Sequence, residues 1–396
     1  MNHEEPDSAP ELPVSPSIKA PKTKEGIETL IRKIVREHKS PVLLILKSVL
    51  SKQYSIFKKR LPTVEPFYAV KSNPHPQILK HMVSLGCSFD AASAKEIEWV
   101  LKAGAKRKNI IFANTIKSEQ DLQYAFEHRI NLMTFDNELE LYKIAKHCPK
   151  ARVILRIKVD NIGSVVQLSL KFGADPDQAT YLLKKAKSLG LNPEGISFHV
   201  GSQCTNINNY IQALEVSAKI FAEAENADIS LKMLDIGGGF PIKYFDAEDG
   251  TIFEKMASTM RKEIKRLFKN YTNLRIIAEP GRFFCGPAGI LITQVVGKAF
   301  RDNKNYYYIN DGVYQDFSGV IFDHCKYEFK TLKRGPKLLC TIAGPTCDSL
   351  DIISLTEELP ELDINNVIYV KNIGAYSCAS AVPAFNGFAP AKVLVI

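Results

Sequence analysis

A lysine at the end of an apolar run is the first residue of this chain that could do covalent chemistry. In Pro66-Phe-Tyr-Ala-Val-Lys71-Ser-Asn-Pro74, a β-prone segment ends in Lys71 and a breaker follows, so Lys71 is expected where a buried strand enters a loop. Burial disfavours the ammonium form and lowers its pKa, which makes the Lys71 amine a candidate for Schiff-base chemistry. A lysine whose charged end reaches the surface is the alternative for this stretch taken alone.

Short apolar runs recur along the chain, and most intervals between them have helical periodicity. The eight runs are Phe67–Val70, Ser88–Ala91, Ile110–Phe112, Leu132–Phe135, Val153–Ile157, Ile196–Val200, Met233–Ile236 and Ile276–Ala278. This alternation predicts an α/β fold built on a (β/α)₈ TIM barrel, with a doubly wound open sheet as the alternative. Polar residues lie in or directly after several of these runs: Lys71, Asp90, Arg156, His199, Asp235, Glu279 and Arg282. In such a barrel they would share the rim where active sites form.

The pattern changes after Arg282, where strand-like runs alternate with Gly and Pro turns. The runs are Ile290–Val296, Tyr306–Asn310, Lys337–Ala343 and Asn366–Val370. We expect a disordered, proline-rich tail over residues 1–25 and a helix and strand over 26–47 that join the β domain. The barrel would span 48–283, and a mostly antiparallel β domain would span 284–396.

The cofactor follows from two features of the expected rim. The glycines Gly237-Gly238-Gly239 let the backbone approach an anion, and Arg282 can add a charge-assisted contact, which together predict a phosphate site. A phosphate site beside a strand-end lysine points to pyridoxal 5'-phosphate bound by Lys71. Glu279 would keep the pyridine nitrogen protonated, and His199 would stack on the ring. A satisfied core histidine is the alternative for His199.

Composition and charge argue against several classes of protein. The formal charge is +9, from 52 basic and 43 acidic residues, yet the basic clusters lack the aromatic residues and motifs of a nucleic-acid module. No apolar stretch is long enough to span a membrane, and the first residues do not have the pattern of a signal peptide. The eight cysteines form neither a zinc-binding pattern nor a disulfide framework. We therefore expect a cytoplasmic protein with no metal, nucleic-acid partner or membrane association.

Eight motifs in one order resemble the eukaryotic-type ornithine decarboxylases. They are Pro66-Phe-Tyr-Ala-Val-Lys-Ser-Asn73, Phe89-Asp-Ala-Ala-Ser93, Phe198-His-Val-Gly-Ser202, Leu234-Asp-Ile-Gly-Gly-Gly-Phe-Pro241, Glu279-Pro-Gly-Arg282, Asn310-Asp-Gly-Val-Tyr314, Gly344-Pro-Thr-Cys-Asp348 and Asn386-Gly-Phe388. The resemblance covers residues from about 26 to the end. It implies an alanine-racemase-like barrel and β domain, and a head-to-tail homodimer with active sites at the subunit interface.

The resemblance also implies a role for each matching residue. Lys71, His199, Glu279 and Cys347 would be catalytic, with Cys347 contributed by the partner chain as proton donor. The cofactor would contact Lys71, Asp90, Glu96, Arg156, His199, Ser202, Gly238, Gly239, Glu279, Gly281, Arg282 and Tyr376. Phe322, Asp323 and the partner chain's Asp348 would bind the substrate, and Lys171 and Asp351 would bridge the dimer.

The implied reaction is decarboxylation of L-ornithine to putrescine in polyamine biosynthesis, with L-lysine as a second substrate giving cadaverine. Phe322, Ser72 and Gln203 depart from the residues that are common in the family, and the chain ends without a long degradation tail, so antizyme-directed turnover is not expected. One alternative is a diaminopimelate decarboxylase-like enzyme, although Asp348 and Asp351 have the wrong charge for a distal carboxylate. The other is a catalytically inactive regulatory homologue, which the presence of Lys71 and Cys347 disfavours.

Overall fold

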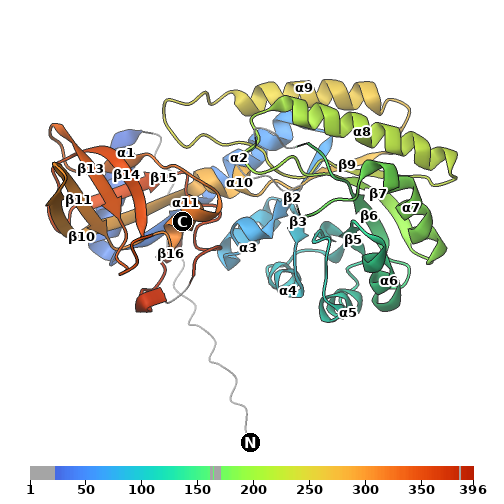
Figure 1. Cartoon of the computed structure of the whole chain (residues 1–396), viewed down its shortest axis with the longest axis horizontal. Helices are drawn as coiled ribbons and strands as arrows, with labels where there is room; N and C mark the ends of the chain where they lie inside the picture. The colour runs from blue at the N-terminus through green and yellow to red at the C-terminus, as the bar shows by residue number, and fades with distance from the viewer. Residues whose placement is uncertain (1–22, 161–163, 165–170, 383–384) are drawn as a thin grey trace, which may run out of the picture.

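The computed structural model describes residues 23–160, 164, 171–382 and 385–396. A barrel surrounded by helices lies beside a curled β sheet, with helix α1 (Lys24–Glu37) against the sheet (Figure 1). Most of the tail expected at residues 1–25 lies outside the described residues. Its last residues begin α1, where the Thr23 side chain accepts the Gly26 N–H at 3.1 Å and caps the helix.

Eight parallel strands close into a barrel, which confirms the predicted fold class. In barrel order they are β2 (Val64–Ala69), β3 (Ser88–Ala91), β4 (Ile110–Phe112), β5 (Leu132–Phe135), β6 (Arg152–Arg156), β7 (Asn192–Ser197), β8 (Met233–Asp235) and β9 (Arg275–Ala278). The closing pair joins β2 to β9, with Val64 opposite Ile276 and Pro66 opposite Ala278. The rim at the carboxyl ends of these strands therefore begins and ends at neighbouring strands.

Helices cover the outside of the barrel (Figure 1). They are α2 (Lys47–Arg60), α3 (Pro76–Ser84), α4 (Ala94–Lys102), α5 (Glu119–Glu127), α6 (Glu138–His147), α7 (Ala179–Ser188), α8 (Ile207–Asn226) and α9 (Ile252–Leu267). Side-chain caps start several of them: Ser93, Ser118 and Asn137 each accept an N–H from the first turn of α4, α5 and α6. These caps start α4, α5 and α6 within a few residues of the preceding strand, whereas longer loops follow β6 and β8.

The β domain contains strands from both ends of the chain. Its strands are β1 (Val42–Ile45), β10 (Gly289–Arg301), β11 (Lys304–Ile309), β12 (Phe329–Thr331), β13 (Lys337–Ala343), β14 (Ile352–Pro360), β15 (Val367–Lys371) and β16 (Lys392–Val395). The short helices α10 (Arg282–Cys285) and α11 (Gly319–Phe322) lie between the barrel and the later strands. Two pairs, β1 with β16 and β11 with β13, are parallel, and the other five pairs are antiparallel, which confirms the predicted mostly antiparallel domain.

Four barrel strands, β2, β6, β7 and β8, end earlier than predicted, and two of these differences concern candidate site residues at the rim. Strand β2 ends at Ala69, and Lys71 lies in η1 (Val70–Ser72), a 3₁₀ helix of one turn, rather than on the strand. Strand β7 ends at Ser197, so His199 lies beyond it. The apolar run continues past each strand because the rim residues are themselves buried, which hydrophobicity alone cannot distinguish from a strand.

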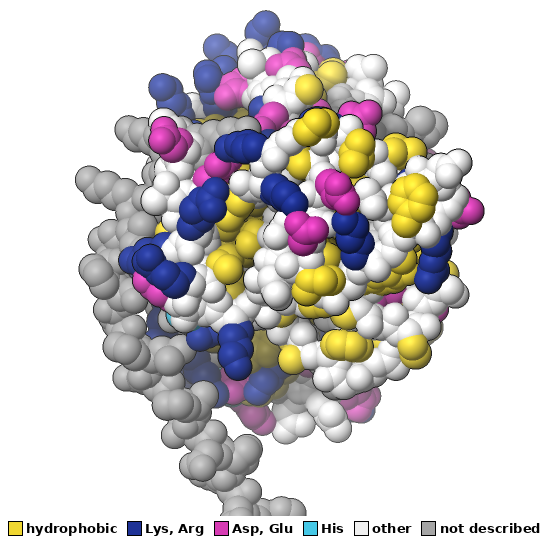
Figure 2. Space-filling model, turned by 90° about the vertical axis from the view of Figure 1, so that its left-hand side faces the viewer, with side chains coloured by type: hydrophobic (Ala, Val, Ile, Leu, Met, Phe, Trp, Pro, Cys, Tyr) yellow, Lys and Arg dark blue, Asp and Glu magenta, His cyan; other side chains and the backbone are white. Residues whose placement is uncertain are grey.

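Side chains on the outer end of the β domain are mixed in character. Figure 2 shows Lys and Arg among Asp, Glu and apolar side chains on this face, rather than one continuous basic patch. None of the helices in the described part of the chain is both long and apolar enough to cross a lipid bilayer. Within the same residues, no three His, Cys, Asp or Glu side chains gather in a way that could hold a metal ion.

The core beside the rim is centred on the fully buried ring of Phe57 in α2. This ring packs against Phe240, Phe253, Phe283 and Phe284, with centroid distances of 5.2 to 6.0 Å. Phe240 follows the triple glycine, and Phe283 and Phe284 follow Arg282. The aromatic cluster therefore holds the two backbone segments that carry the expected phosphate site.

Replacing Phe57 with alanine should destabilise the protein by about 3–5 kcal/mol, because a large buried ring is lost and its four aromatic neighbours close the cavity only in part. The free energy of unfolding, measured by urea denaturation, tests this value. Phe126→Ala is the matched control, since that ring is 52% exposed, and its loss should cost less than about 1 kcal/mol. Equal losses for the two variants would contradict the central role of the cluster.

Candidate active site

A cavity of about 270 Å³ opens at the carboxyl end of the barrel. Residues from β2, β6, β7, β8 and β9 and their following loops line it, together with loops of the β domain. Ten of the residues singled out from the sequence are among the lining residues: Lys71, Arg156, His199, Ser202, Gly239, Glu279, Gly281, Arg282, Asp323 and Tyr376. The barrel and the β domain together thus place side chains around one cavity that lie more than 300 positions apart in the sequence.

Lys71, which lines this cavity, forms an ion pair with Asp90. Its Nζ lies 2.5 Å from Asp90 Oδ2; the Asp90 side chain is 1% exposed and that of Lys71 is 43% exposed. Burial by itself would lower the pKa of the Lys71 ammonium, but the carboxylates of Asp90 and Glu279 outweigh it and raise this pKa above its usual value. The lowered pKa expected from the sequence is therefore wrong, because the sequence did not show how close these carboxylates are.

Carboxyl groups crowd the rim next to Lys71. Asp235 is buried at the end of β8, where its Oδ1 accepts the Gly237 N–H at 2.9 Å, and it lies close to Glu279. Burial and the negative charges of Asp235 and Asp90 raise the pKa of Glu279 well above its usual value. Arg156, whose pKa burial lowers, is the nearby cation that offsets part of this charge.

His199 is held in its neutral form. Its Nδ1 accepts the Gly201 N–H at 3.0 Å, which leaves the ring proton on Nε2. Burial, together with the cations Arg156 and Lys71, lowers the pKa of His199 well below its usual value. Gly238 packs next to this ring, because a Cβ there would lie 3.1 Å from His199 Nε2 and 2.8 Å from the Glu279 carbonyl oxygen. A side chain at position 238 would push the imidazole out of place.

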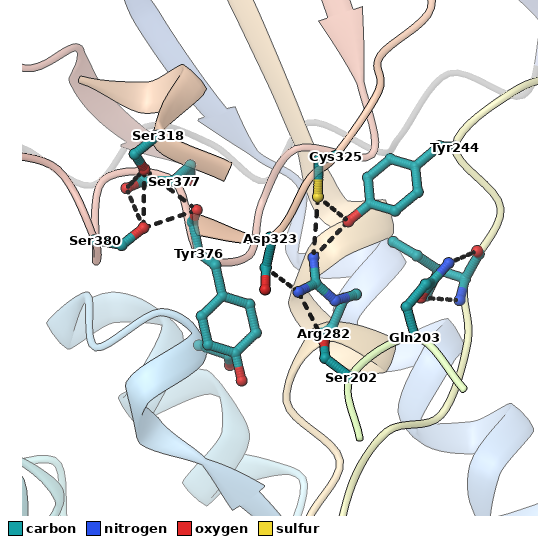
Figure 3. A network of polar contacts seen from close by, with 12 residues as sticks. Ser202, Gln203, Tyr244, Arg282, Ser318, Asp323, Cys325, Tyr376, Ser377 and Ser380 are labelled. Atoms are coloured by element: carbon teal, nitrogen blue, oxygen red, sulfur yellow. Dashed lines mark hydrogen bonds and ion pairs between the residues drawn. The ribbon is translucent and has the colours of Figure 1, made fainter. Parts of the chain in front are cut away.

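Arg282 is a buried cation with neighbours on several sides (Figure 3). One terminal nitrogen, Nη2, donates to Ser202 Oγ at 3.1 Å and to the Asp323 carboxylate, with which it forms an ion pair. The other, Nη1, donates to the Tyr244 hydroxyl at 2.5 Å. The Tyr376 ring lies 4.7 Å from the guanidinium carbon. Asp323, proposed from the sequence to bind the substrate amine, is therefore paired here with the arginine of the expected phosphate site.

The donors around Arg282 fit a phosphate group. Arg282 Nε is buried and has no hydrogen-bond partner, and in the described part of the chain the N–H groups of Gly238 and Gly239 donate to no protein acceptor. Buried donors of this kind call for an acceptor from outside the chain. With the Lys71 amine and the Glu279 carboxyl in the same cavity, these donors match the functional groups of pyridoxal 5'-phosphate.

Other predicted site residues lie away from this cavity. Glu96 accepts the Ala92 N–H at 2.7 Å, and burial raises the pKa of Glu96 to about 7. Cys347 is exposed, Phe322 is 58% exposed, and Asp348 accepts hydrogen bonds from the Tyr314 hydroxyl and the Leu350 N–H. None of these four side chains lines the cavity of its own chain.

The two residues expected to bridge a dimer have different surroundings. Lys171 is exposed, with Nζ 4.8 Å from the centre of the Phe172 ring. Asp351 is 2% exposed, and its carboxylate accepts the N–H groups of Val313 and Thr346 within its own chain. The structure therefore gives Asp351 an internal role, and its bridge to Lys171 stays a prediction.

Several cavity residues were missed or only partly understood from the sequence. Tyr244 and Cys325 contact Arg282, and Phe172 stacks against Arg156 at 5.4 Å. The Gln203 amide exchanges two hydrogen bonds with the backbone N–H and carbonyl of Ile242, so it joins the loops after β7 and β8. All four residues lie in loops, where no periodicity indicates the direction of a side chain.

Comparisons with known proteins show which proteins this chain is similar to. The family described as "Pyridoxal-dependent decarboxylase, pyridoxal binding domain" matches residues 47–286. The ornithine decarboxylase of Caenorhabditis elegans is 39% identical over 90% of this chain and 87% of its own. The arginine decarboxylase of Paramecium bursaria Chlorella virus, solved with agmatine, has a TM-score of 0.89 at 34% identity and covers 93% of this chain and 100% of its own. The lysine/ornithine decarboxylase of Vibrio vulnificus, solved with putrescine, has a TM-score of 0.88 at 32% identity, with coverages of 94% and 99%.

Replacing Asp90 with asparagine should lower the pKa of Lys71, because the carboxylate that stabilises the ammonium is removed. In the cofactor-free protein, Lys71 should then react with an acylating reagent at lower pH than in the wild type, which mass spectrometry of the labelled peptide can follow. Glu98→Gln is the control, since Glu98 pairs with the surface residues Lys95 and Lys102 instead. An unchanged pH profile in Asp90→Asn would refute the proposed electrostatic control of Lys71.

Proposed function

Since the chain belongs to the pyridoxal-dependent decarboxylases, we propose that it converts L-ornithine to putrescine and CO₂, with L-lysine as a second substrate. One structural observation carries the proposal. A single cavity gathers a lysine amine, a neutral imidazole, a carboxyl group and a buried arginine, in Lys71, His199, Glu279 and Arg282. These are the groups that pyridoxal 5'-phosphate needs around its aldehyde, ring and phosphate.

Each group of the cofactor has residues suited to hold it. Lys71 is the amine that would anchor it, and Arg282, Ser202, Gly239 and Tyr376 would hold its phosphate. When bound, the cofactor supplies an electron sink for the charge left on Cα as CO₂ departs. Glu279 would keep a proton at the pyridine nitrogen, and the neutral imidazole of His199 would stack on the ring.

Recognition of the substrate depends on its distal ammonium group. Asp323 lines the cavity, and Asp348 from a partner chain would complete a pair of carboxylates for this charge. A diaminopimelate-like substrate has a carboxylate at this end, which Asp323 and Asp348 would repel. The solved relatives that act on lysine or arginine have the same fold, so the loops rather than the barrel would set the preferred chain length.

We propose a head-to-tail homodimer because part of the site is absent from each chain. Cys347, the expected proton donor at Cα, and Asp348 do not line the cavity of their own chain. Large apolar side chains nearby are also exposed, including Leu350 at 67% and Phe322 at 58%. A partner chain that covers them would bring Cys347 and Asp348 to the mouth of the cavity, with Lys171 near the contact.

Three further predictions from the sequence concern the domain division, the location in the cell and the alternative of an inactive homologue. The domain division at residues 25, 47 and 283 agrees with the match over 47–286 and with the pairing of β1 to β10. The cytoplasmic location stays a prediction from the sequence. An inactive regulatory homologue is disfavoured because Lys71, His199, Arg282 and Cys347 are all present.

The substrate is tested by measuring kcat/KM for CO₂ release from L-ornithine, L-lysine, L-arginine and meso-diaminopimelate with added pyridoxal 5'-phosphate. Ornithine should be preferred, and lysine should follow by about 10- to 200-fold, because one methylene is worth ~1–3 kcal/mol. Lys71→Ala is the control and should release no CO₂ from any of them. Absence of release from both ornithine and lysine would overturn the proposed function.

Shared sites are tested by mixing two inactive variants, Lys71→Ala and Cys347→Ala. Random exchange makes half of the dimers mixed, each with one intact site of two, so about a quarter of wild-type activity should return. Native mass spectrometry verifies that mixed dimers have formed. If mixed dimers form and activity stays absent, each site is built from one chain.

A further inference from the structure

Of the two terminal nitrogens of Arg282, Nη2 is the one that a phosphate in the cavity can reach. Nη1 donates to Tyr244 at 2.5 Å, and Cys325 Sγ lies 3.9 Å from the same nitrogen. Nη2 donates to Ser202 and to Asp323, which also line the cavity (Figure 3). An anion that binds Nη2 must therefore take the place of one of these two acceptors.

Charge balance selects Asp323 as the group that is displaced. The side chains of Arg282 and Asp323 are only 6% and 14% exposed, so each needs the charge of the other when no ligand is bound. A phosphate dianion next to Arg282 takes over the neutralising role and repels the carboxylate. Ser202 is neutral, and its hydroxyl can donate to the phosphate while it stays in place.

We propose that Asp323 has two positions: paired with Arg282 before the cofactor binds, and turned into the cavity after the cofactor phosphate displaces it. This inference deepens the proposed function, because the released carboxylate is the one that would meet the distal ammonium of the diamino acid. Arg282, which would bind the cofactor phosphate, thus keeps the substrate-binding carboxylate of Asp323 occupied until the cofactor binds. Asp323 lies at the end of α11, where its backbone N–H donates to Gly319 at 3.0 Å, so a side-chain rotation is sufficient for the change.

The two positions impose an order of binding. Before the cofactor binds, Asp323 is neutralised by Arg282 and offers little attraction to a diamino acid. After release, it is a poorly solvated negative charge that a substrate ammonium would stabilise. Binding of the cofactor at Arg282 therefore strengthens binding of the substrate at Asp323, and the reverse, although the two ligands contact different residues.

The affinity of cofactor-free protein for pyridoxal 5'-phosphate and for pyridoxal, which lacks the phosphate, tests this proposal by isothermal titration calorimetry. Asp323→Asn should bind pyridoxal 5'-phosphate about tenfold or more tightly than the wild type, because no charged pair has to be broken. Its affinity for pyridoxal should change by less than about threefold. Glu248→Gln is the matched control: Glu248 lines the neighbouring cavity, and the hydrogen bond it accepts from the Tyr244 N–H at 2.7 Å is one that glutamine can keep. That variant should bind both ligands as the wild type does.

Crystal structures of the wild-type full chain, without and with pyridoxal 5'-phosphate, provide the second arm and remain available if Asp323→Asn fails to fold. The ion pair between Arg282 and Asp323 should be intact in the structure without pyridoxal 5'-phosphate and broken in the structure with it. A pair that stays closed in both structures overturns the proposal, even if Asp323→Asn binds the cofactor more tightly. Equal or weaker cofactor binding by Asp323→Asn overturns it as well. Decarboxylation of ornithine is measured separately. The proposed function can therefore fail while the ion pair still breaks on cofactor binding, and the ion pair can stay intact while the enzyme still decarboxylates ornithine.

Discussion

The pairing of β2 with β9 is the contact on which the site depends. It closes the barrel and sets the loop after the first strand, with Lys71, next to the loop after the last, with Glu279 and Arg282. The Ala69 N–H also donates to the Pro280 carbonyl, which joins the end of β2 to the loop after β9. Without this closure, the amine and the arginine would lie at opposite edges of an open sheet. The doubly wound alternative therefore could not build this cavity from the same residues.

Charges at the rim are balanced within the protein. Lys71 is paired with Asp90, Arg282 with Asp323, and Arg156 is close to Asp136 and Glu279. Buried charges without partners would cost several kcal/mol each, so these pairs stabilise the site. The same pairs are the ones that a phosphate and an amino acid would exchange for their own charges. The site therefore combines folding stability and ligand binding in the same side chains.

Much of the fold could be predicted because barrel strands are short, apolar and separated by capped helices. Strands β3, β4 and β5 were predicted to the residue, and β2 and β7 were placed too far toward the rim. The parallel pairs of the β domain were missed because they join strands distant in the sequence, such as β1 and β16. Alternation along one strand indicates which face is buried, but it does not identify the neighbouring strand.

The sequence by itself determined which chemical groups are present and that most of them share one rim. Residue type and strand order suffice for that, since parallel strands in a barrel end at the same face. Only the tertiary structure decided the state of those groups. The pKa of Lys71 is raised rather than lowered, Asp351 is internal, and Asp323 is paired with Arg282. These outcomes depend on distances of a few ångströms between side chains on different loops, because the strength of an ionic contact depends on separation and burial rather than on residue identity.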